Sequence, residues 1–394
     1  MAPLEPWPIH LSDEVLDDLR GRLRRARLAP DFENDDWEYG TNGEYLADLV
    51  RYWADEFDWR AQETAMNAYP NHRVEIQGLP IHFLHAPRKG PSPMPLVLTH
   101  GWPWTFWEFR QLLGPLSDPA AHGGDPADAF DVIVPSLPGF GFSTPLSRGG
   151  VGVYDVPDLW VELMRDRLGH ERFAAHGGDY GAQVTAQLGH KYPEHLIGLH
   201  FSPRPYRLEI WNVERPWAGL IAGSGGLPED PDLRAATIAY ERKRVGHVVA
   251  NILDPQTFSH AFNDSPAGLA SWYVSRRRGF GDTGGDIESV FPRDDLLTNF
   301  TIYWATQSVS TAARFYLENW KQGWTPSHDG KQVDVPTAVT LLRADLPPGL
   351  SMDWMYDAFD IRFVNELDRG GHYAPAERPE AIIEDIRKHF RTLR

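Results

Sequence analysis

The stretch from Arg172 to Gly181, Arg-Phe-Ala-Ala-His-Gly-Gly-Asp-Tyr-Gly, decides the fold of this chain. It begins as a short apolar strand at 173–176 and ends in the pattern Gly-x-Asp-x-Gly, and residues 182–191 continue as a predicted helix. A strand passes into a helix through so few residues only by a tight, strained turn, and side chains in place of the flanking glycines would clash there. The stretch therefore predicts a strand–turn–helix unit with Asp179 at its tip.

Asp179 occupies the position that a serine holds in the nucleophile-elbow pattern Gly-x-Ser-x-Gly. A serine needs a base before it can attack, whereas a carboxylate is already ionised at neutral pH and can attack an alkyl carbon directly to form an ester. The expected substrate is therefore an electrophilic sp³ carbon, such as an epoxide or an alkyl halide, rather than an amide. Gly and Asp are also common in ordinary turns, so the rest of the chain has to decide between a nucleophile and a plain turn.

The composition predicts a soluble protein with a large core. The chain has 394 residues, of which 42% are hydrophobic, so two or three subdomains are expected. The net charge of −17 argues against nucleic-acid or anionic-membrane partners, and the lack of cysteine excludes disulfides and thiol chemistry. The N-terminus lacks a signal pattern, and the chain has no apolar run of about 18 residues. We therefore expect a cytoplasmic location, and no pattern implies a cofactor or a metal.

Apolar runs that alternate with helical patterns predict an α/β fold with a mostly parallel sheet, covered by helices on both faces. The predicted helices include residues 105–116, 182–191 and 378–393. The predicted strands are 95–99, 131–135, 173–176, 196–202, 338–342 and 361–366.

Two further parts flank or interrupt this core. Residues 1–90 form a predicted N-terminal extension with leucines at near-helical spacing from Leu16 to Leu28, followed by short strands at 72–76 and 81–85. Residues 204–325 are helical in pattern and rich in aromatic residues, and they separate the two core parts 91–203 and 326–394. Open α/β sheets bind ligands at the carboxyl ends of their strands, so we expect this insertion to form a lid there.

The loop after the first core strand predicts an oxyanion hole. His100-Gly101-Trp102-Pro103 ends that strand, and a glycine and a proline there force a sharp loop whose N–H groups can point inward. The N–H groups of Trp102 and Tyr180 are the expected donors. The glycines of the loop 135–143 allow it to approach the turn at Asp179 closely. We therefore predict a scaffold role for this loop and assign it no chemistry.

A histidine and an acid complete the expected site. His372, in Gly370-Gly371-His372, lies between the last strand and the last helix, where a base that activates water is expected. Its acid partner should follow the strand 338–342, which indicates Asp345. Glu366 and Asp368 are rivals, but they stand too near His372 in the order nucleophile, acid, histidine.

Together these residues resemble the α/β-hydrolase-fold epoxide hydrolases, in the microsomal-type branch with an extra N-terminal domain. The resemblance covers nearly the whole chain, apart from the membrane anchor of the mammalian members. It implies that Asp179 is the nucleophile, His372 the base, Asp345 its acid partner and Tyr316 a lid donor to the epoxide oxygen. The motifs that carry the resemblance are 100–103, 135–143, 178–181, Asn263-Asp264-Ser265-Pro266-Ala267-Gly268-Leu269, Asp295-Leu296-Leu297-Thr298-Asn299, Arg314-Phe315-Tyr316-Leu317-Glu318-Asn319 and 370–372.

One position departs from the family pattern. The second lid tyrosine usually follows a glycine ahead of the Asn-Asp-Ser-Pro motif, but here Gly246 is followed by His247. His247 could donate in its place, Tyr240 could substitute, or one tyrosine could suffice. The expected partners are a small apolar or aromatic epoxide and water, and a homodimer is one of the assemblies that the sequence allows.

Two other functions stay open at this stage. A haloalkane dehalogenase shares the Asp nucleophile, but it typically places Trp after it, where this chain has Tyr180. A catalytically silent binding protein of the same fold would not need the set Asp179, Asp345 and His372.

Overall fold

A mostly parallel sheet of eight strands forms the centre of the protein. The computed structural model describes residues 4–91, 94–214 and 228–394, and the strand order in its sheet is β1-β2-β4-β3-β5-β6-β7-β8. β1 pairs with β2 and β2 with β4 in antiparallel fashion, whereas the other pairs are parallel. The strands are β1 (Asn71–Ile76), β2 (Leu79–Ala86), β3 (Met94–Thr99), β4 (Phe130–Pro135), β5 (Phe173–Gly177), β6 (Leu196–Phe201), β7 (Val333–Leu342) and β8 (Phe359–Leu367).

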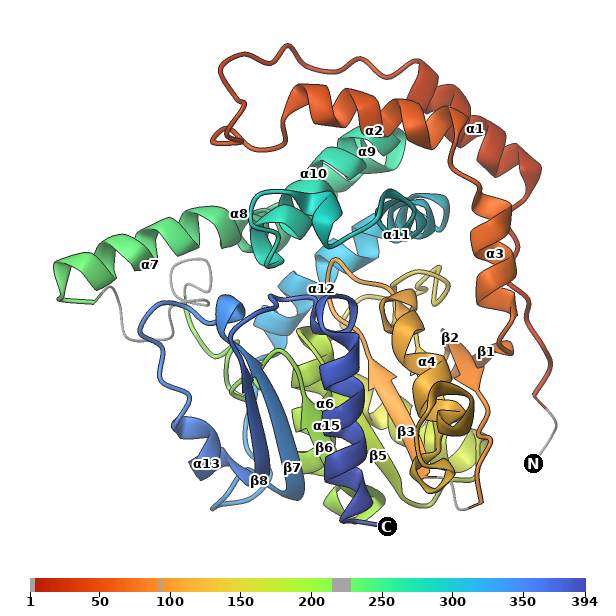
Figure 1. Ribbon diagram of the computed structural model, residues 1–394, viewed down its shortest axis with the longest axis vertical. Coiled ribbons are helices and arrows are strands. Elements are labelled where there is room, and N and C mark those ends of the chain that lie inside the picture. The colour runs from red at the N-terminus through yellow and green to blue at the C-terminus, as the bar shows by residue number, and fades with distance from the viewer. Residues whose placement is uncertain (1–3, 92–93, 215–227) are drawn as a thin grey trace.

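Helices cover the sheet on both faces (Figure 1). α4 (Arg110–Ser117) and α15 (Pro379–Arg391) contact each other on one face, while α5 (Val156–Val161) and α6 (Tyr180–Lys191) contact each other on the other. The central strands read as apolar runs because helices bury both of their faces, as β4 and β5 show with every residue buried. The predicted fold class is confirmed.

In the described part of the predicted lid, which leaves out residues 215–227, six α-helices lie above the carboxyl ends of the strands. Their boundaries follow local capping signals: in the Asn-Asp-Ser-Pro motif, Ser265 ends one helix and caps the next, accepting a bond from the Gly268 N–H at 3.0 Å, with Pro266 as the first helical residue. The helices are α7 (Pro231–Arg244), α8 (Gly246–Leu253), α9 (Pro255–Asp264), α10 (Pro266–Phe280), α11 (Arg293–Ala305) and α12 (Val309–Gln322).

The N-terminal helices α1 (Asp13–Arg24), α2 (Gly43–Asp55) and α3 (Trp59–Asn67) run from the β1–β2 edge to the outer side of the lid (Figure 1). The buried Trp53 of α2 donates from its indole nitrogen to Thr301 of α11 at 3.0 Å. The Tyr52 hydroxyl donates to Asp294 at 2.9 Å. The lid is therefore held between the core and the N-terminal extension.

Some predicted boundaries differ from the structure. α1 ends at Arg24, so Leu28 lies beyond the helix that the leucine spacing suggested. The helix predicted at 105–116 starts as the 3-10 turn Phe106–Phe109 and becomes α4 only at Arg110. The strands β1 and β2, placed in the N-terminal extension by the sequence, belong to the core sheet. Local patterns identify the elements but not the long-range pairing of β2 with β4.

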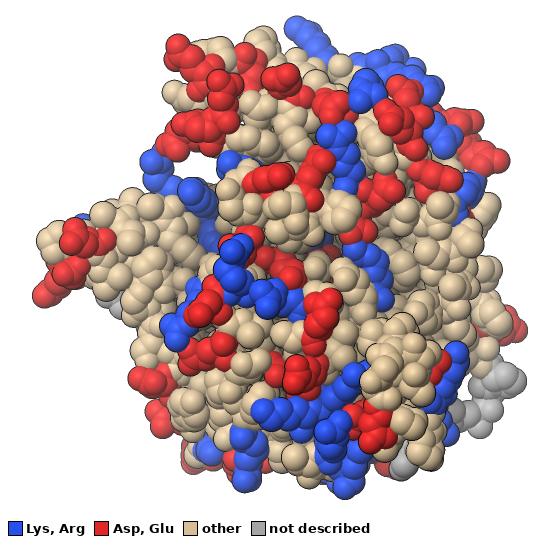
Figure 2. Space-filling model, viewed as in Figure 1, with Lys and Arg blue, Asp and Glu red and all other residues tan. Residues whose placement is uncertain are grey.

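Two short helices complete the C-terminal part. α13 (Trp354–Ala358) precedes β8, and α14 (Ala374–Glu377) separates the histidine loop from α15, so the helix predicted at 378–393 begins one residue later. Within the residues that the structure describes, no helix is long and apolar enough to cross a bilayer. Figure 2 shows acidic and basic side chains intermixed over the visible face.

Candidate active site

Asp179 lies at the tip of a strained turn between β5 and α6. Its backbone has φ 53° and ψ −122°, a conformation that a non-glycine residue adopts only when the surrounding structure enforces it. A Cβ on Gly177 would lie 2.1 Å from the carbonyl oxygen of Gly181, and one on Gly181 would lie 1.8 Å from that of Thr99. Both flanking glycines are thus sterically required, and the predicted strand–turn–helix unit is confirmed.

The loop after β3 provides a donor to the Asp179 carboxylate. The N–H of Trp102 donates to Asp179 Oδ1 at 2.8 Å. Gly101 allows this approach, since a Cβ there would lie 2.3 Å from the Asp179 Cβ. Tyr180 is the first residue of α6, so its N–H has no acceptor within the helix. The structure therefore places both predicted oxyanion-hole residues beside Asp179.

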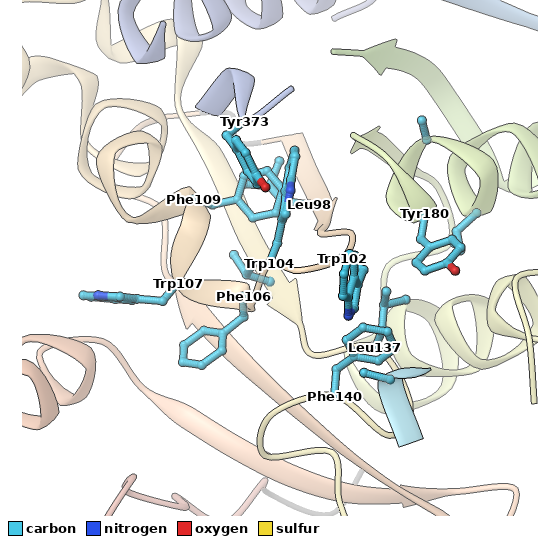
Figure 3. Packing of buried hydrophobic residues seen from close by; sticks show 14 of the residues in the cluster. Leu98, Trp102, Trp104, Phe106, Trp107, Phe109, Leu137, Phe140, Tyr180 and Tyr373 are labelled. Atoms are coloured by element: carbon cyan, nitrogen blue, oxygen red, sulfur yellow. The ribbon is translucent and has the colours of Figure 1, made fainter. Parts of the chain in front are cut away.

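The loop 135–143 supports the Trp102 loop. His100 accepts a bond from the Leu137 N–H on Nε2 at 3.1 Å, and its Nδ1 lies 2.9 Å from the Gly101 carbonyl oxygen. Burial lowers the pKa of His100 to about 4, so its ring is neutral and Nδ1–H is the donor to that carbonyl. Figure 3 shows Trp102 packed near Leu137 and Phe140. The hydrogen bond from Leu137 to His100 is consistent with the scaffold role that we expect for this loop.

His372 lies between two carboxylates. Its Nδ1 is 3.0 Å from Asp345 Oδ1, and its Nε2 is 3.3 Å from Asp179 Oδ2. Burial disfavours the imidazolium, but Asp345 and then Asp179 outweigh that effect and raise the pKa of His372 to about 9. The three residues predicted as nucleophile, base and acid thus form one connected triad.

Asp345 is fully buried and held by two arginines that sequence reasoning missed. Its Oδ1 lies 2.7 Å from Arg244 NH1 of α7, and its Oδ2 lies 3.2 Å from Arg204 Nε, in the segment after β6. Burial raises the pKa of Asp345, but His372 and then the two arginines lower it well below its ordinary value. The rivals Glu366 and Asp368 instead pair with Arg343 at the surface.

Glu377 holds the histidine loop and was also missed. Its carboxylate accepts bonds from the N–H groups of Gly371 at 2.7 Å, Tyr373 at 2.9 Å and Asp282 at 2.8 Å. Two of these donors flank His372 directly, so the backbone of the base is fixed from both sides. A glutamate four residues after Tyr373 was the available signal, because carboxylates near a helix start often accept free N–H groups.

Tyr316 and His247 of the lid line the same cavity as Asp179. The Tyr316 ring meets the rings of Tyr180 and Trp102 edge-on, with centroids 5.0 and 5.6 Å away. The His247 ring stacks on Trp102 at 4.9 Å and meets Tyr316 at 5.5 Å. Tyr240, the other alternative, uses its hydroxyl to donate to the Asp345 carbonyl oxygen at 2.8 Å. His247, and not Tyr240, therefore takes the position facing Tyr316.

A single cavity joins these groups. It is lined by the triad and both lid side chains, together with aromatic residues such as Trp211 and Phe280. Burial, followed by the Asp179 charge, raises the pKa of Tyr316 well above 10, so its hydroxyl keeps its proton. Burial lowers the pKa of His247 well below 6.5, so its ring is neutral. The cavity thus places hydrogen-bond donors opposite a carboxylate within apolar walls.

Comparisons with known proteins agree with this geometry. The epoxide hydrolase N-terminus family matches residues 4–109, and the alpha/beta hydrolase fold family matches residues 94–202. Epoxide hydrolase 1 of Oryctolagus cuniculus is 35% identical over 98% of this chain and 88% of that protein. The crystal structure of juvenile hormone epoxide hydrolase from Bombyx mori has a TM-score of 0.81 and 26% identity over 99% of this chain and 94% of that one. Aspergillus niger epoxide hydrolase has a TM-score of 0.81 and 25% identity over 100% and 97%.

The fold and the site define an enzyme of the α/β-hydrolase class. Within that class the chain belongs to the epoxide hydrolase family, and it acts on an epoxide and water. The resemblance that the sequence motifs indicated is confirmed.

Proposed function

We propose that this epoxide hydrolase forms a vicinal diol through a covalent ester on Asp179. The observation that carries the proposal is the placement of Asp179 between Trp102 and His372. Its Oδ1 accepts the Trp102 N–H at 2.8 Å, and its Oδ2 faces His372 Nε2 at 3.3 Å. Oδ2 then attacks the epoxide carbon, and Oδ1 becomes the ester carbonyl oxygen that the oxyanion hole already binds.

Ring opening needs a proton donor in the lid. When Oδ2 forms its bond to carbon, the carbon–oxygen bond of the ring breaks and leaves an alkoxide. Tyr316 supplies the main donor, since its hydroxyl keeps its proton and its ring lies in the cavity opposite Asp179. His247 is a second donor, since its neutral ring carries one N–H and lines the cavity beside Tyr316.

Hydrolysis of the ester then needs a base. Water attacks the ester carbonyl carbon and gives a proton to His372 Nε2, while Asp345 stabilises the resulting imidazolium across the 3.0 Å contact. The bond between the carbonyl carbon and the substrate oxygen then breaks, and that oxygen takes the proton from His372, so the diol leaves and the Asp179 carboxylate is restored. Alkylation removes the negative charge of Asp179, which is one of the two charges that raise the pKa of His372. The first step therefore lowers the pKa of His372 and increases the fraction of neutral rings that can accept a proton in the second step.

The substrate is a small apolar or aromatic epoxide. The aromatic side chains in the cavity walls, including Trp211 and Phe280, favour an apolar group beside the reacting carbon. A haloalkane is the second candidate, but a hydroxyl and a neutral imidazole suit an oxygen leaving group better. A cytoplasmic location and a homodimer remain predictions from the sequence.

The test is diol release from an aryl epoxide by the wild type and by Asp179→Asn. Loss of the nucleophile typically costs several powers of ten in rate. The matched control is Asp368→Asn, because Asp368 is 92% exposed and outside the cavity. Near-normal diol formation by Asp179→Asn would contradict the covalent mechanism. Halide release without epoxide turnover would favour the dehalogenase.

A further inference from the structure

Arg204 and Arg244 bind Asp345 so that both of its carboxylate oxygens are occupied. Oδ1 is shared by His372 Nδ1 at 3.0 Å and Arg244 NH1 at 2.7 Å, and Oδ2 faces Arg204 Nε at 3.2 Å. We infer that both arginines are positioning residues for the triad, and that Arg244 makes docking of the lid helix α7 a condition for its assembly. This inference rests on the proposed function.

Arg244 joins three segments that are distant in sequence. Besides Asp345, its Nη2 nitrogen donates to the carbonyl oxygens of Ala344 at 3.2 Å and Phe280 at 3.1 Å. The Phe280 carbonyl also accepts the backbone N–H of His372 at 3.0 Å. One lid guanidinium therefore contacts the loop of the acid and the backbone group that holds the histidine. A planar, multi-donor side chain is suited to this, and a lysine is not equivalent.

α7 contacts the acid a second time through Tyr240. The Tyr240 hydroxyl donates to the Asp345 carbonyl oxygen at 2.8 Å, and the Arg244 guanidinium lies over the Tyr240 ring at 4.6 Å from its centroid. The two residues lie four positions apart, on one face of the helix. Displacement of α7 from the core would thus remove a bond to the Asp345 backbone and a bond to its carboxylate at once.

The cluster has one more positive charge than negative. Two guanidinium groups with side chains 12% and 10% exposed face one carboxylate that is 1% exposed. Arginines stay charged, so the excess cation disfavours the imidazolium form of His372. The charged and titratable groups around His372 are Asp179, Asp345, Arg204, Arg244, His247, Tyr240, Tyr316 and Tyr373. Arg204 and Arg244 are the permanent cations among these groups, and a nearby positive charge disfavours the imidazolium.

The experiment measures the two chemical steps separately in Arg244→Gln and in a control. Arg242 lies on the same helix, but it is 69% exposed and pairs with Glu38, so Arg242→Gln is the matched control. Single-turnover mixing with an aryl epoxide, followed by intact-mass spectrometry, gives the rates of ester formation and ester hydrolysis between pH 5 and 10.

Arg244→Gln should slow hydrolysis at pH 7 about tenfold or more and move its acid limb to higher pH by about one unit, because a nearby positive charge is lost. Ester formation should change much less, since no hydrogen bond or ion pair joins Asp179 to Arg244 among the residues that the structure describes. Arg244→Lys should restore the acid limb, because the positive charge is kept. Hydrolysis should stay slower than in the wild type, because a compact ammonium does not reproduce the planar spread of donors that reaches Asp345, Ala344 and Phe280.

If Arg244→Gln slows ester formation and ester hydrolysis equally and does not shift the acid limb of the pH profile, the inference is overturned. Arg244 would then be a structural residue of the lid. If Arg244→Gln does not fold, Arg244→Lys decides: selective slowing of hydrolysis supports the inference, and equal slowing of both steps overturns it. A wild type that turns over the epoxide without any ester would instead contradict the proposed function.

Discussion

Replacing Asp179 with asparagine should lower the pKa of His372. Asp179 Oδ2 lies 3.3 Å from His372 Nε2, and two unit charges at that distance interact by about 5 kcal/mol at an effective dielectric of 20. The Asp179 side chain is 17% exposed, and the amide oxygen can still accept a bond, so the measured effect should be smaller. A neighbouring opposite charge typically shifts a pKa by about 1–3 units.

The direction of the pKa shift depends on which form of His372 the Asp179 charge stabilises. The Asp179 carboxylate favours the imidazolium, so its removal lowers the pKa of His372 from about 9. At pH 7 about 1% of the wild-type rings are then neutral, and a fall of two units would make about half of them neutral. Asp179→Asn carries the same charge as the alkylated enzyme, so it reports the state in which His372 has to accept a proton.

The assay is a pH titration by NMR with isotope-labelled histidine, with the resonance assigned by its loss in His372→Gln. Mass spectrometry verifies that the amide at position 179 is intact during the titration. His372 titrating near pH 9 in both proteins would refute the reasoning, since Asp179 would then contribute nothing to the basicity of the histidine.

Four further outcomes are expected. His372→Gln should accumulate the ester, because alkylation needs no base but hydrolysis does. The ester appears as a protein mass increased by the mass of the epoxide. A folded variant with neither adduct nor turnover would contradict the role of His372. Tyr316→Phe should cost on the order of 3 kcal/mol in the rate of ring opening, whereas His247→Tyr should alter which carbon of a chiral aryl epoxide is attacked; a silent Tyr316→Phe beside an inactive His247→Ala would reverse this ranking. One turnover in ¹⁸O-labelled water should place a protein oxygen in the diol, and full labelling in the first turnover would indicate direct attack by water.

The proposed nucleophile and its partners could be located from the sequence because steric and topological rules act locally there. Gly177 and Gly181 flank Asp179 for a reason that any tight strand-to-helix turn imposes. The order nucleophile, acid, histidine follows from successive strands whose carboxyl ends share one edge of the sheet. These relations are readable without knowing how distant segments pack.

Contacts between distant segments could not be predicted in this way. Arg244 stands 101 residues before Asp345, and nothing in its local pattern distinguishes it from Arg242, which faces solvent on the same helix. The structure also explains two family motifs that have no evident chemical role in the sequence. Asn299 of α11 accepts a bond from Thr105 at 2.5 Å, and Asn319 of α12 accepts the Val153 N–H at 2.8 Å, so both attach the lid to the core.

The position of the N-terminal helices limits how this enzyme can be re-engineered. Leu49 and Trp53 of α2 are buried, and Trp53 meets Phe300 of α11 edge-on at 6.2 Å. A lid transplanted from a hydrolase that lacks such helices would present the wrong outer surface to them, leaving apolar side chains exposed to water and the Trp53 indole without its acceptor. Variant libraries that reshape the lid for new epoxides should therefore exchange α2, α10 and α11 together as one unit.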